Sequence, residues 1–286
     1  LVIPGLAVGS IYALIAAGFA LIFRGTAVMN FAHGSLVLVG GYTAYSVSSL
    51  DLPYSYAWAL VASAAVTAAV AWAVQAGIFS RLHGLPLFAM FMITLGIDTV
   101  MFSIISGYRS WSASPKEIVS PWGITTMQLG PFRAPIASLW IIGITVVLVS
   151  ALALFLRRSK WGLAMQVTAL DGELARILGI RTGRVFAMSW GIAGGLAAFA
   201  GVFLGTFPRL LETSTHGIAL RAIPAAVLGG IDSVFGAGLG GLVIGLIEVF
   251  AAAYAPSWLG QGFHVIMPYV LMFVVLLVKP EGFFGT

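Results

Sequence analysis

Charged residues are scarce in this sequence. Only 8% of the 286 residues are charged, 60% are hydrophobic, and the mean hydropathy is +1.06. A soluble domain carries about 25% charged residues, which help to cover its surface. The composition therefore excludes an ordinary soluble protein. The 14 Lys and Arg residues lie between long apolar runs, so we interpret them as signals of membrane topology and expect no nucleic-acid partner.

Cysteine is absent, which excludes disulfides, thiolate metal sites and cysteine nucleophiles. The four histidines, His33, His83, His216 and His264, are far apart, and none has the spacing of a metal site. The sequence also lacks the Gly-x-x-x-x-Gly-Lys loop that holds nucleotide phosphates. We therefore expect no catalytic residue, metal or cofactor in this chain. A membrane-embedded enzyme would need paired catalytic groups, and none is found.

Long apolar runs dominate what is present, and a transmembrane helix needs about 20 such residues. The runs cover residues 1–23, 25–50, 52–80, about 85–107, 134–156, 185–208, 218–255 and about 264–278. The run 218–255 is long enough for two crossings and is broken at residues 229–233. The pattern predicts an all-α, polytopic transmembrane bundle of about eight to nine spans with broken or re-entrant helices. We expect one domain over residues 1–286, whose first run is a span and not a cleaved signal.

Basic residues set the expected orientation, because they concentrate on the cytoplasmic side. If the chain crosses the membrane nine times, nine basic residues fall on one side: Arg24, Arg81, Arg157, Arg158, Lys160, Arg176, Arg181, Arg184 and Lys279. The other side receives four: Arg109, Lys116, Arg133 and Arg209. This asymmetry places the N-terminus outside and the C-terminus in the cytoplasm. The loop 157–184 is then cytoplasmic, and the polar loop 108–135 is extracytoplasmic.

The cytoplasmic loop contains a short amphipathic segment. Thr168 and Asp171 have the Ser/Thr-x-x-Asp/Glu spacing of a helix start, and Gly179 supplies a stop. Between them the apolar side chains fall on one helical face: Leu170, Leu174, Ile177 and Leu178. Such a helix could lie on lipid headgroups or fit a groove on a soluble partner that supplies energy.

Three charges lie inside apolar runs. Asp98 and Glu248 are unpaired in sequence, and a charge at membrane depth is a candidate functional site. A structural carboxylate that is protonated or in contact with water is an equal alternative. For Arg221, near the start of a run, snorkelling or pairing is favoured over substrate binding. The many glycines inside the runs favour close helix packing, with hinges or broken helices as the functional alternative.

Several blocks along the chain resemble a known family. They are residues 9–14 (Gly-Ser-Ile-Tyr-Ala-Leu), 29–34 (Met-Asn-Phe-Ala-His-Gly), 169–180, 226–230 (Ala-Val-Leu-Gly-Gly) and 279–285 (Lys-Pro-Glu-Gly-Phe-Phe-Gly). In this order they resemble the permeases of branched-chain amino-acid ABC importers, and residues 169–180 resemble their ATPase-coupling loop. The block at 29–34 points to the shorter of the two permease types that pair in such systems. Gly172 and Asp98 depart from the expected pattern and leave the substrate open.

The resemblance implies an importer in a prokaryotic cytoplasmic (inner) membrane. Its other parts would be a second homologous permease, two cytoplasmic ATPase subunits that bind ATP and Mg, and an extracytoplasmic binding protein that delivers a branched-chain or other hydrophobic amino acid. Urea or short amides are alternative substrates within the family. A stand-alone secondary transporter or channel is the alternative from another class.

Site residues follow from the same resemblance. We expect broken segments to line the substrate path, with Asn30, Phe31, His33, Gly34, Gly229 and Gly230. For His33, packing near a helix start is the favoured role. The expected ATPase-coupling residues are Leu170, Asp171, Glu173, Leu174, Ile177, Leu178 and Gly179.

Overall fold

The computed structural model describes residues 1–50, 54–81, 86–129, 132–206, 208–256 and 262–285. His83 lies outside the described residues. The helices are α1 (Val2–Thr26), α2 (His33–Ser48), α3 (Ser55–Gly77), α4 (Leu87–Gly107), α5 (Arg109–Ser112), α6 (Ile136–Arg158), α7 (Lys160–Leu170), α8 (Gly172–Ile177), α9 (Thr182–Gly205), α10 (Ile218–Gly229), α11 (Val234–Tyr254) and α12 (Phe263–Val278). Short 3-10 turns η1 (Phe79–Arg81) and η2 (Thr213–Gly217) and strands β1 (Thr126–Leu129) and β2 (Phe132–Pro135) complete the described elements.

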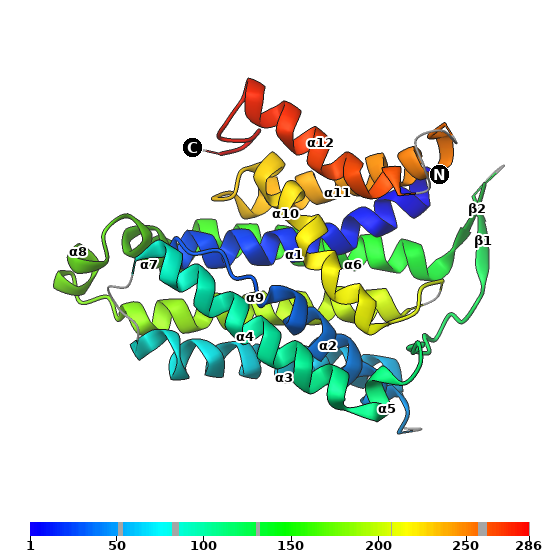
Figure 1. The fold of residues 1–286 in the computed structure, drawn as a ribbon, viewed down its shortest axis with the longest axis horizontal. Coiled ribbons are helices and arrows are strands. Elements are labelled where there is room, and N and C mark those ends of the chain that lie inside the picture. The colour runs from blue at the N-terminus through cyan, green and yellow to red at the C-terminus, as the bar shows by residue number, and fades with distance from the viewer. Residues whose placement is uncertain (51–53, 82–85, 130–131, 207, 257–261, 286) are drawn as a thin grey trace.

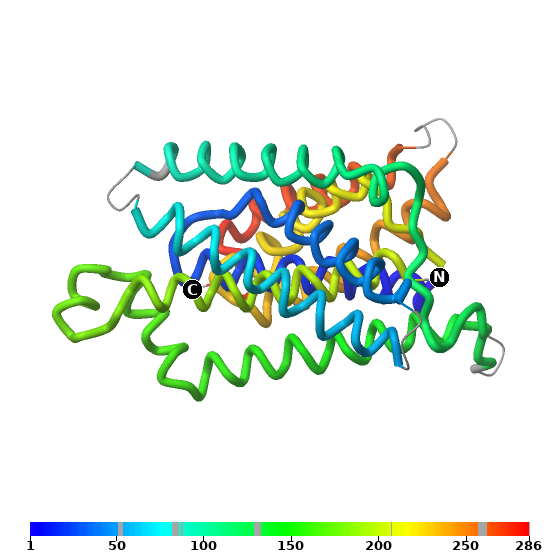
Figure 2. Tube along the Cα trace, turned by 90° about the horizontal axis from the view of Figure 1, so that it is seen from below, coloured from blue at the N-terminus to red at the C-terminus, as the bar shows by residue number. Residues whose placement is uncertain are grey.

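Six helices among the described residues are long and apolar enough to cross a membrane. They are α1, α3 extended by η1, α4, α6, α9 and α11. The shorter helices α2 and α10 lie among them, α12 lies at the edge of the bundle beside α10 and α11, and the long helices run roughly along one axis (Figures 1 and 2). The structure therefore confirms a polytopic helical bundle.

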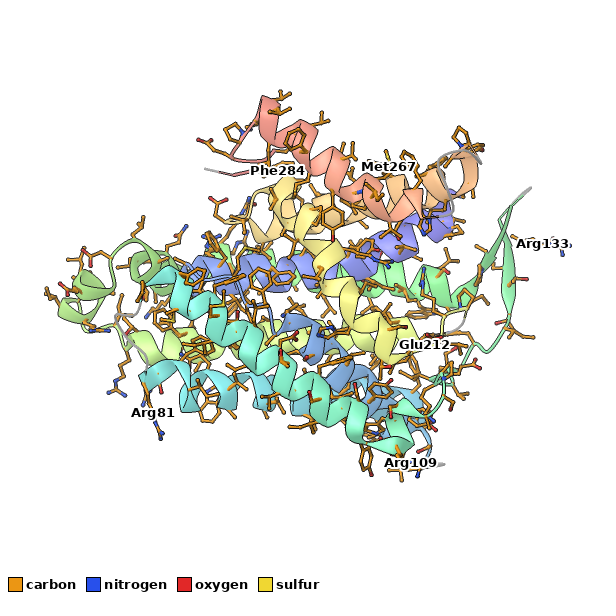
Figure 3. All side chains as sticks on the ribbon, in the orientation of Figure 1. Arg81, Arg109, Arg133, Glu212, Met267 and Phe284 are labelled. Atoms are coloured by element: carbon orange, nitrogen blue, oxygen red, sulfur yellow. The ribbon has the colours of Figure 1, made fainter. Side chains whose placement is uncertain are left out.

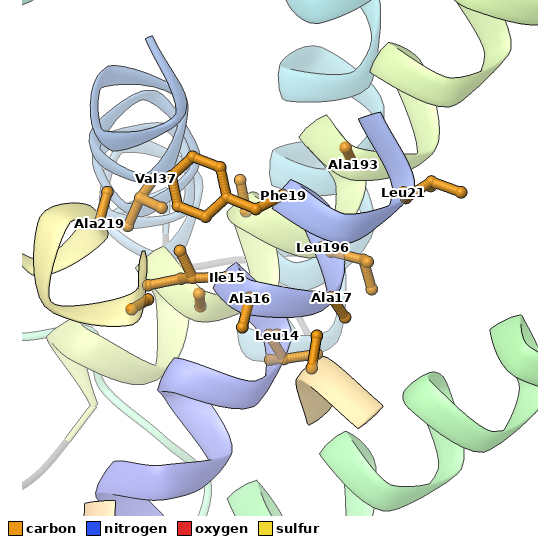
Figure 4. Packing of buried hydrophobic residues seen from close by; sticks show 14 of the residues in the cluster. Leu14, Ile15, Ala16, Ala17, Phe19, Leu21, Val37, Ala193, Leu196 and Ala219 are labelled. Carbon is orange, nitrogen blue, oxygen red and sulfur yellow. The ribbon is translucent and has the colours of Figure 1, made fainter. Parts of the chain in front are cut away.

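Helix α1 is the centre of the bundle. Its main neighbours are α11, α9, α6 and α10. Leu14, Ile15 and Phe19 lie between these helices, with Val37 of α2 and Ala193 of α9 beside them (Figure 4). By contrast, only 17% of the α4 window and 28% of the α6 window is buried. These outer helices present their apolar side chains to lipid or to another subunit.

Glycine permits a close approach of the α1 and α11 backbones. A Cβ atom on Gly241 would overlap the backbone of Ala13, and one on Gly245 would overlap the backbone of Gly9. Lipid provides no hydrophobic force between helices, so close packing of small residues supplies the contact energy. This observation supports the packing interpretation of these glycines.

The loop 108–135 contains strands, which the all-α prediction did not foresee. Strands β1 and β2 pair in antiparallel register, with Met127 opposite Ala134. The hairpin projects at the end of the bundle where Arg109 and Arg133 lie, opposite Arg81 (Figures 1 and 3). Before it, Lys116 forms an isolated antiparallel bridge with Leu211. Outside the apolar runs, water satisfies exposed strand edges, so a short hairpin is permitted there.

Candidate translocation and coupling sites

The block at 29–34 lies at a break between two helices. Helix α1 ends where Ala27 adopts a left-handed conformation (φ 54°), and α2 begins only at His33. The predicted run 25–50 is therefore not one continuous helix. The amide oxygen of Asn30 accepts a hydrogen bond from the Ala32 backbone N–H at 3.0 Å. This turn redirects the chain between α1 and α2. The Asn30 side chain is fully buried there, and its Nδ2 has no hydrogen-bond partner in the described part of the chain.

His33 packs at the start of α2. Its ring lies 4.8 Å from the ring of Phe19, and a Cβ atom on Gly18 would meet the imidazole. The side chain is fully buried, and neither ring nitrogen has a hydrogen-bond partner in the described part of the chain. Nearby, the ring of Phe31 contacts that of Phe91 edge to face.

Both predicted path segments touch α10, at opposite ends. A Cβ atom on Gly34 would lie 2.8 Å from the carbonyl oxygen of His216, just before α10. Gly229 and Gly230 form the other end of this helix, about 16 Å away at the rise of an α-helix. There the Phe284 backbone N–H donates to the Gly229 carbonyl, so the C-terminal tail covers this end.

A first polar cluster connects α10 to α2 and α4. The Asp98 carboxylate oxygen Oδ1 accepts a hydrogen bond from Ser35 at 2.6 Å and lies 2.9 Å from His216 Nε2. The His216 ring also packs on Phe102, with centroids 4.6 Å apart. Asp98 is thus paired in space, although its sequence gives no sign of the partners.

A second polar cluster connects the same segment to α1 and α11. The Tyr12 hydroxyl donates to Glu248 Oε2 at 2.5 Å, and Arg221 Nη1 lies 3.7 Å from Glu248 Oε1. Glu248 is buried, whereas the Arg221 side chain is 40% exposed. Arg221 therefore pairs, as the sequence favoured. Tyr12 was missed, because a tyrosine in an apolar run gives no local signal of its partner.

The two clusters bracket one short segment. His216 and Arg221 are five residues apart, just before and just within α10. One reaches Asp98 on α4, and the other reaches Glu248 on α11. Helix α10 crosses in front of α1 and between these neighbours (Figure 1). Its position is consequently set by polar side-chain contacts as well as by packing.

The loop 157–184 forms the two helices α7 and α8, and the predicted helix start is wrong. Thr168 lies inside α7, where its hydroxyl donates back to the Ala164 carbonyl. The cap of α8 is Asp171, whose Oδ1 accepts the backbone N–H groups of Glu173 and Leu174. Because aspartate is a strong N-cap, α7 ends and a new helix begins there.

The two glycines of this loop differ in role. Gly172, which departs from the family pattern, is the first residue of α8 and therefore does not interrupt this helix. Gly179 has φ +79°, and the Ile180 N–H donates to the Ala175 carbonyl across it. This left-handed glycine ends the helix in the manner the sequence predicted.

The apolar stripe at α8 has no cover in the described part of the chain. It begins at Leu170, the last residue of α7, which is 87% exposed, and continues to Ile177 of α8, which is 82% exposed. Leu174 and Leu178 are exposed as well, whereas Ala175 faces the body of the protein and is buried. Helix α8 projects from the end of the bundle opposite the hairpin (Figure 1). This end of the bundle thus presents an exposed apolar surface.

Comparison with known proteins identifies the family. Residues 1–278 match the model described as the permease component of the branched-chain amino acid transport system. The chain belongs to this family. It is 32% identical to the high-affinity branched-chain amino acid transport system permease protein LivH of Escherichia coli (strain K12), covering 98% of this chain and 93% of LivH. The corresponding BraD protein of Pseudomonas aeruginosa is 29% identical, over 99% of this chain and 94% of BraD.

The fold is also known from a solved structure. PsaBC from Streptococcus pneumoniae in complex with Fab aligns with a TM-score of 0.50 at 14% identity, covering 97% of this chain and 91% of that chain. Family membership confirms the prediction of an ABC transporter permease, a translocation subunit and not an enzyme. The six apolar helices agree with a permease embedded in the membrane.

Proposed function

We propose that this chain is the membrane-spanning permease of an ATP-driven, binding-protein-dependent importer of branched-chain or other hydrophobic amino acids. Membership of the branched-chain amino acid permease family over residues 1–278 carries this proposal. The partners are a second homologous permease, two cytoplasmic ATPase subunits that hold ATP and Mg, and an extracytoplasmic substrate-binding protein. The complex lies in the cytoplasmic (inner) membrane of a prokaryote.

The topology has nine crossings. The six long helices supply six, and α2, α10 and α12 supply three more if the non-helical residues beside them complete each crossing. An odd number of crossings places the two termini on opposite sides, and the distribution of basic residues assigns the N-terminus to the outside and the C-terminus to the cytoplasm. The basic loop 157–184 is then cytoplasmic, in agreement with the concentration of Lys and Arg on that side.

The substrate path follows α10. Helix α10 is short, carries Pro224 in its interior and contacts both predicted path segments, at Gly34 and at Gly229–230. Non-helical backbone at membrane depth is tolerated where it is buried or lines a water-filled path. In this proposal Asn30, Phe31 and Gly34 border the path and His33 supports them by packing.

Helix α8 couples the permease to an ATPase subunit. Its exposed stripe of Leu170, Leu174, Ile177 and Leu178 suits a groove on a soluble partner, with Asp171 and Gly179 fixing the ends of the helix and Glu173 in its first turn. Burying one leucine is worth roughly 1.5–3 kcal/mol, and burying an unpaired charge costs at least as much. Leu174→Asp should therefore abolish ATPase binding. Leu174→Met, which keeps the apolar volume, should retain it.

The test combines both parts of the proposal. Membrane vesicles that contain the permease, its ATPase partners and the binding protein should accumulate labelled leucine only with ATP, and unlabelled urea or acetamide should not compete. Leu174→Asp should insert normally yet lose ATPase co-purification and uptake. Uptake by the lone chain with a proton or sodium gradient would support a secondary transporter instead. Competition by urea or acetamide would assign the permease to the amide substrates.

A further inference from the structure

A basic pocket lies at one corner of the bundle, where α1 ends, α6 ends and α7 begins. Its volume is about 460 Å³, within the range of small-ligand sites. Four cationic side chains line it: Arg24, Arg157, Arg158 and Lys160. We call this concavity the basic pocket. It is separate from the α10 clusters and from the stripe of α8.

The lining of the basic pocket is strongly positive, because in the described part of the chain it contains four cations and no carboxylate. Asp232 attracts Arg24 from outside this lining, and Arg157 repels it from within. Lys160 is also the first residue of α7, whose N-terminal end adds a partial positive charge. The pocket therefore favours an anion.

An exposed apolar surface runs from the middle of α6 to the basic pocket. Val147, Leu154 and Arg158 follow one another at helical spacing, and Val147 and Leu154 are exposed. On the other side of the corner, Leu163 and Trp161 of α7 are exposed. Tryptophan is enriched at the membrane–water boundary. The cations of the basic pocket thus lie at the end of the apolar surface of α6, along which lipid acyl chains can pack.

The general excess of basic residues on the cytoplasmic side does not explain why four cations gather in one pocket. Arg176, Arg181 and Arg184 lie in the same loop and are exposed, but they do not line the pocket. Arginine binds phosphate oxygens in a bidentate manner, and basic pockets between transmembrane helices on the cytoplasmic side bind anionic headgroups. We propose that the basic pocket binds the phosphate-bearing headgroup of an anionic phospholipid, whose acyl chains lie along α6.

The proposal is tested by lipid-dependent stability of the purified permease, together with the subunits that co-purify with it. Thermal unfolding is followed in detergent while phosphatidylglycerol, phosphatidylcholine or glycerol phosphate is titrated. Phosphatidylglycerol should raise the unfolding temperature at low concentration, and the other two should not. Each cation near a membrane surface strengthens binding by about fivefold, so the double variant Arg157→Gln/Lys160→Gln should need about 25-fold more phosphatidylglycerol.

The matched control is Arg181→Gln/Arg184→Gln, which removes two exposed charges from the same loop outside the pocket. It should respond to phosphatidylglycerol like the parent. If both double variants responded to phosphatidylglycerol equally weakly, the response would depend on net charge alone, and the proposed lipid site would be overturned. An equal response to glycerol phosphate would identify a free phosphate ligand and overturn the lipid assignment, and no response of the parent to phosphatidylglycerol would overturn both. Leucine uptake tests the proposed function separately, because none of these outcomes depends on transport.

Discussion

The hydrogen bond between Tyr12 and Glu248 allows a sharp test of the second polar cluster. Tyr12→Phe removes only the hydroxyl that donates to Glu248 Oε2 and keeps the buried ring. Arg221 Nη1 lies 3.7 Å from the other carboxylate oxygen, beyond hydrogen-bond distance, and its side chain is partly exposed. Arg221 therefore cannot replace the lost donor without moving. A hydrogen bond to a charged group is worth about 1.5–3 kcal/mol.

The chain supplies a matched control in Tyr42. Both tyrosines are almost fully buried, but the Tyr42 hydroxyl has no hydrogen-bond partner in the described part of the chain. Tyr42→Phe removes an unpaired polar atom and should leave stability unchanged or slightly raised. Tyr12→Phe should lower it by about 1.5–3 kcal/mol. In soluble domains of 150–250 residues, 1 kcal/mol moves the unfolding temperature by about 2–4 °C, which sets the scale of the expected shift.

The measurement is thermal unfolding of both variants beside the parent, in the same detergent and with the same accompanying subunits. A loss for Tyr12→Phe of several degrees, with Tyr42→Phe unchanged, supports the argument. Equal shifts in the two variants would refute it, because the loss would then reflect any Tyr→Phe change in the core. Glu248→Gln should also relieve the attraction that holds Arg221, and α10 amides should then exchange hydrogen faster.

Three further predictions address topology, packing and the first cluster. Single cysteines at Ser114 and Glu173 in this cysteine-free chain should react with an impermeant reagent from opposite sides of the membrane; reaction from one side contradicts the nine-crossing topology. Gly245→Val should reduce the yield of folded protein because the side chain collides with α1, whereas Gly143→Val meets no atom within 4 Å and should not; equal yields would contradict the close packing. Asp98→Asn keeps an acceptor oxygen and should retain more uptake than Asp98→Ala; equal loss would show that charge alone matters at this position.

The sequence predicted the helices of the bundle but not their arrangement. Apolar runs locate α1, α4 and α6 because any span must be apolar, whichever neighbours it has. Yet 83% of the α1 window is buried within the chain, compared with 17% for α4. Hydropathy cannot separate the two, since lipid and protein interior are equally apolar. Small residues indicate burial within the chain better than hydropathy does. Gly9 and Gly245 are examples, because the α1 and α11 backbones meet there.

Local rules worked where a single residue decides the geometry. Gly179 ends its helix because glycine adopts the left-handed conformation without strain. The start of α8 was misplaced because Thr168 and Asp171 both suit a helix start, and only the structure shows that α7 continues through the threonine. The partners of Asp98 and Glu248 come from distant helices, so a charge in an apolar run predicts that a partner exists without saying which one.

The contrast between packed and charged contacts indicates where this permease can move. The α1–α11 contact is made by backbones at glycines, so any sliding produces immediate overlap and the two helices behave as one body. Helix α10 is held partly by His216 with Asp98 and by Arg221 with Glu248, which are side-chain contacts that can rotate or exchange partners. In a low-dielectric surrounding, such contacts are strong when made and costly when unpaired, so they favour a few discrete positions over a continuum. A helix held this way between rigid neighbours is suited to alternate between two states. If α8 couples to an ATPase as proposed, we expect its displacement to switch α10 between those states, and the two clusters are the contacts that would differ between them.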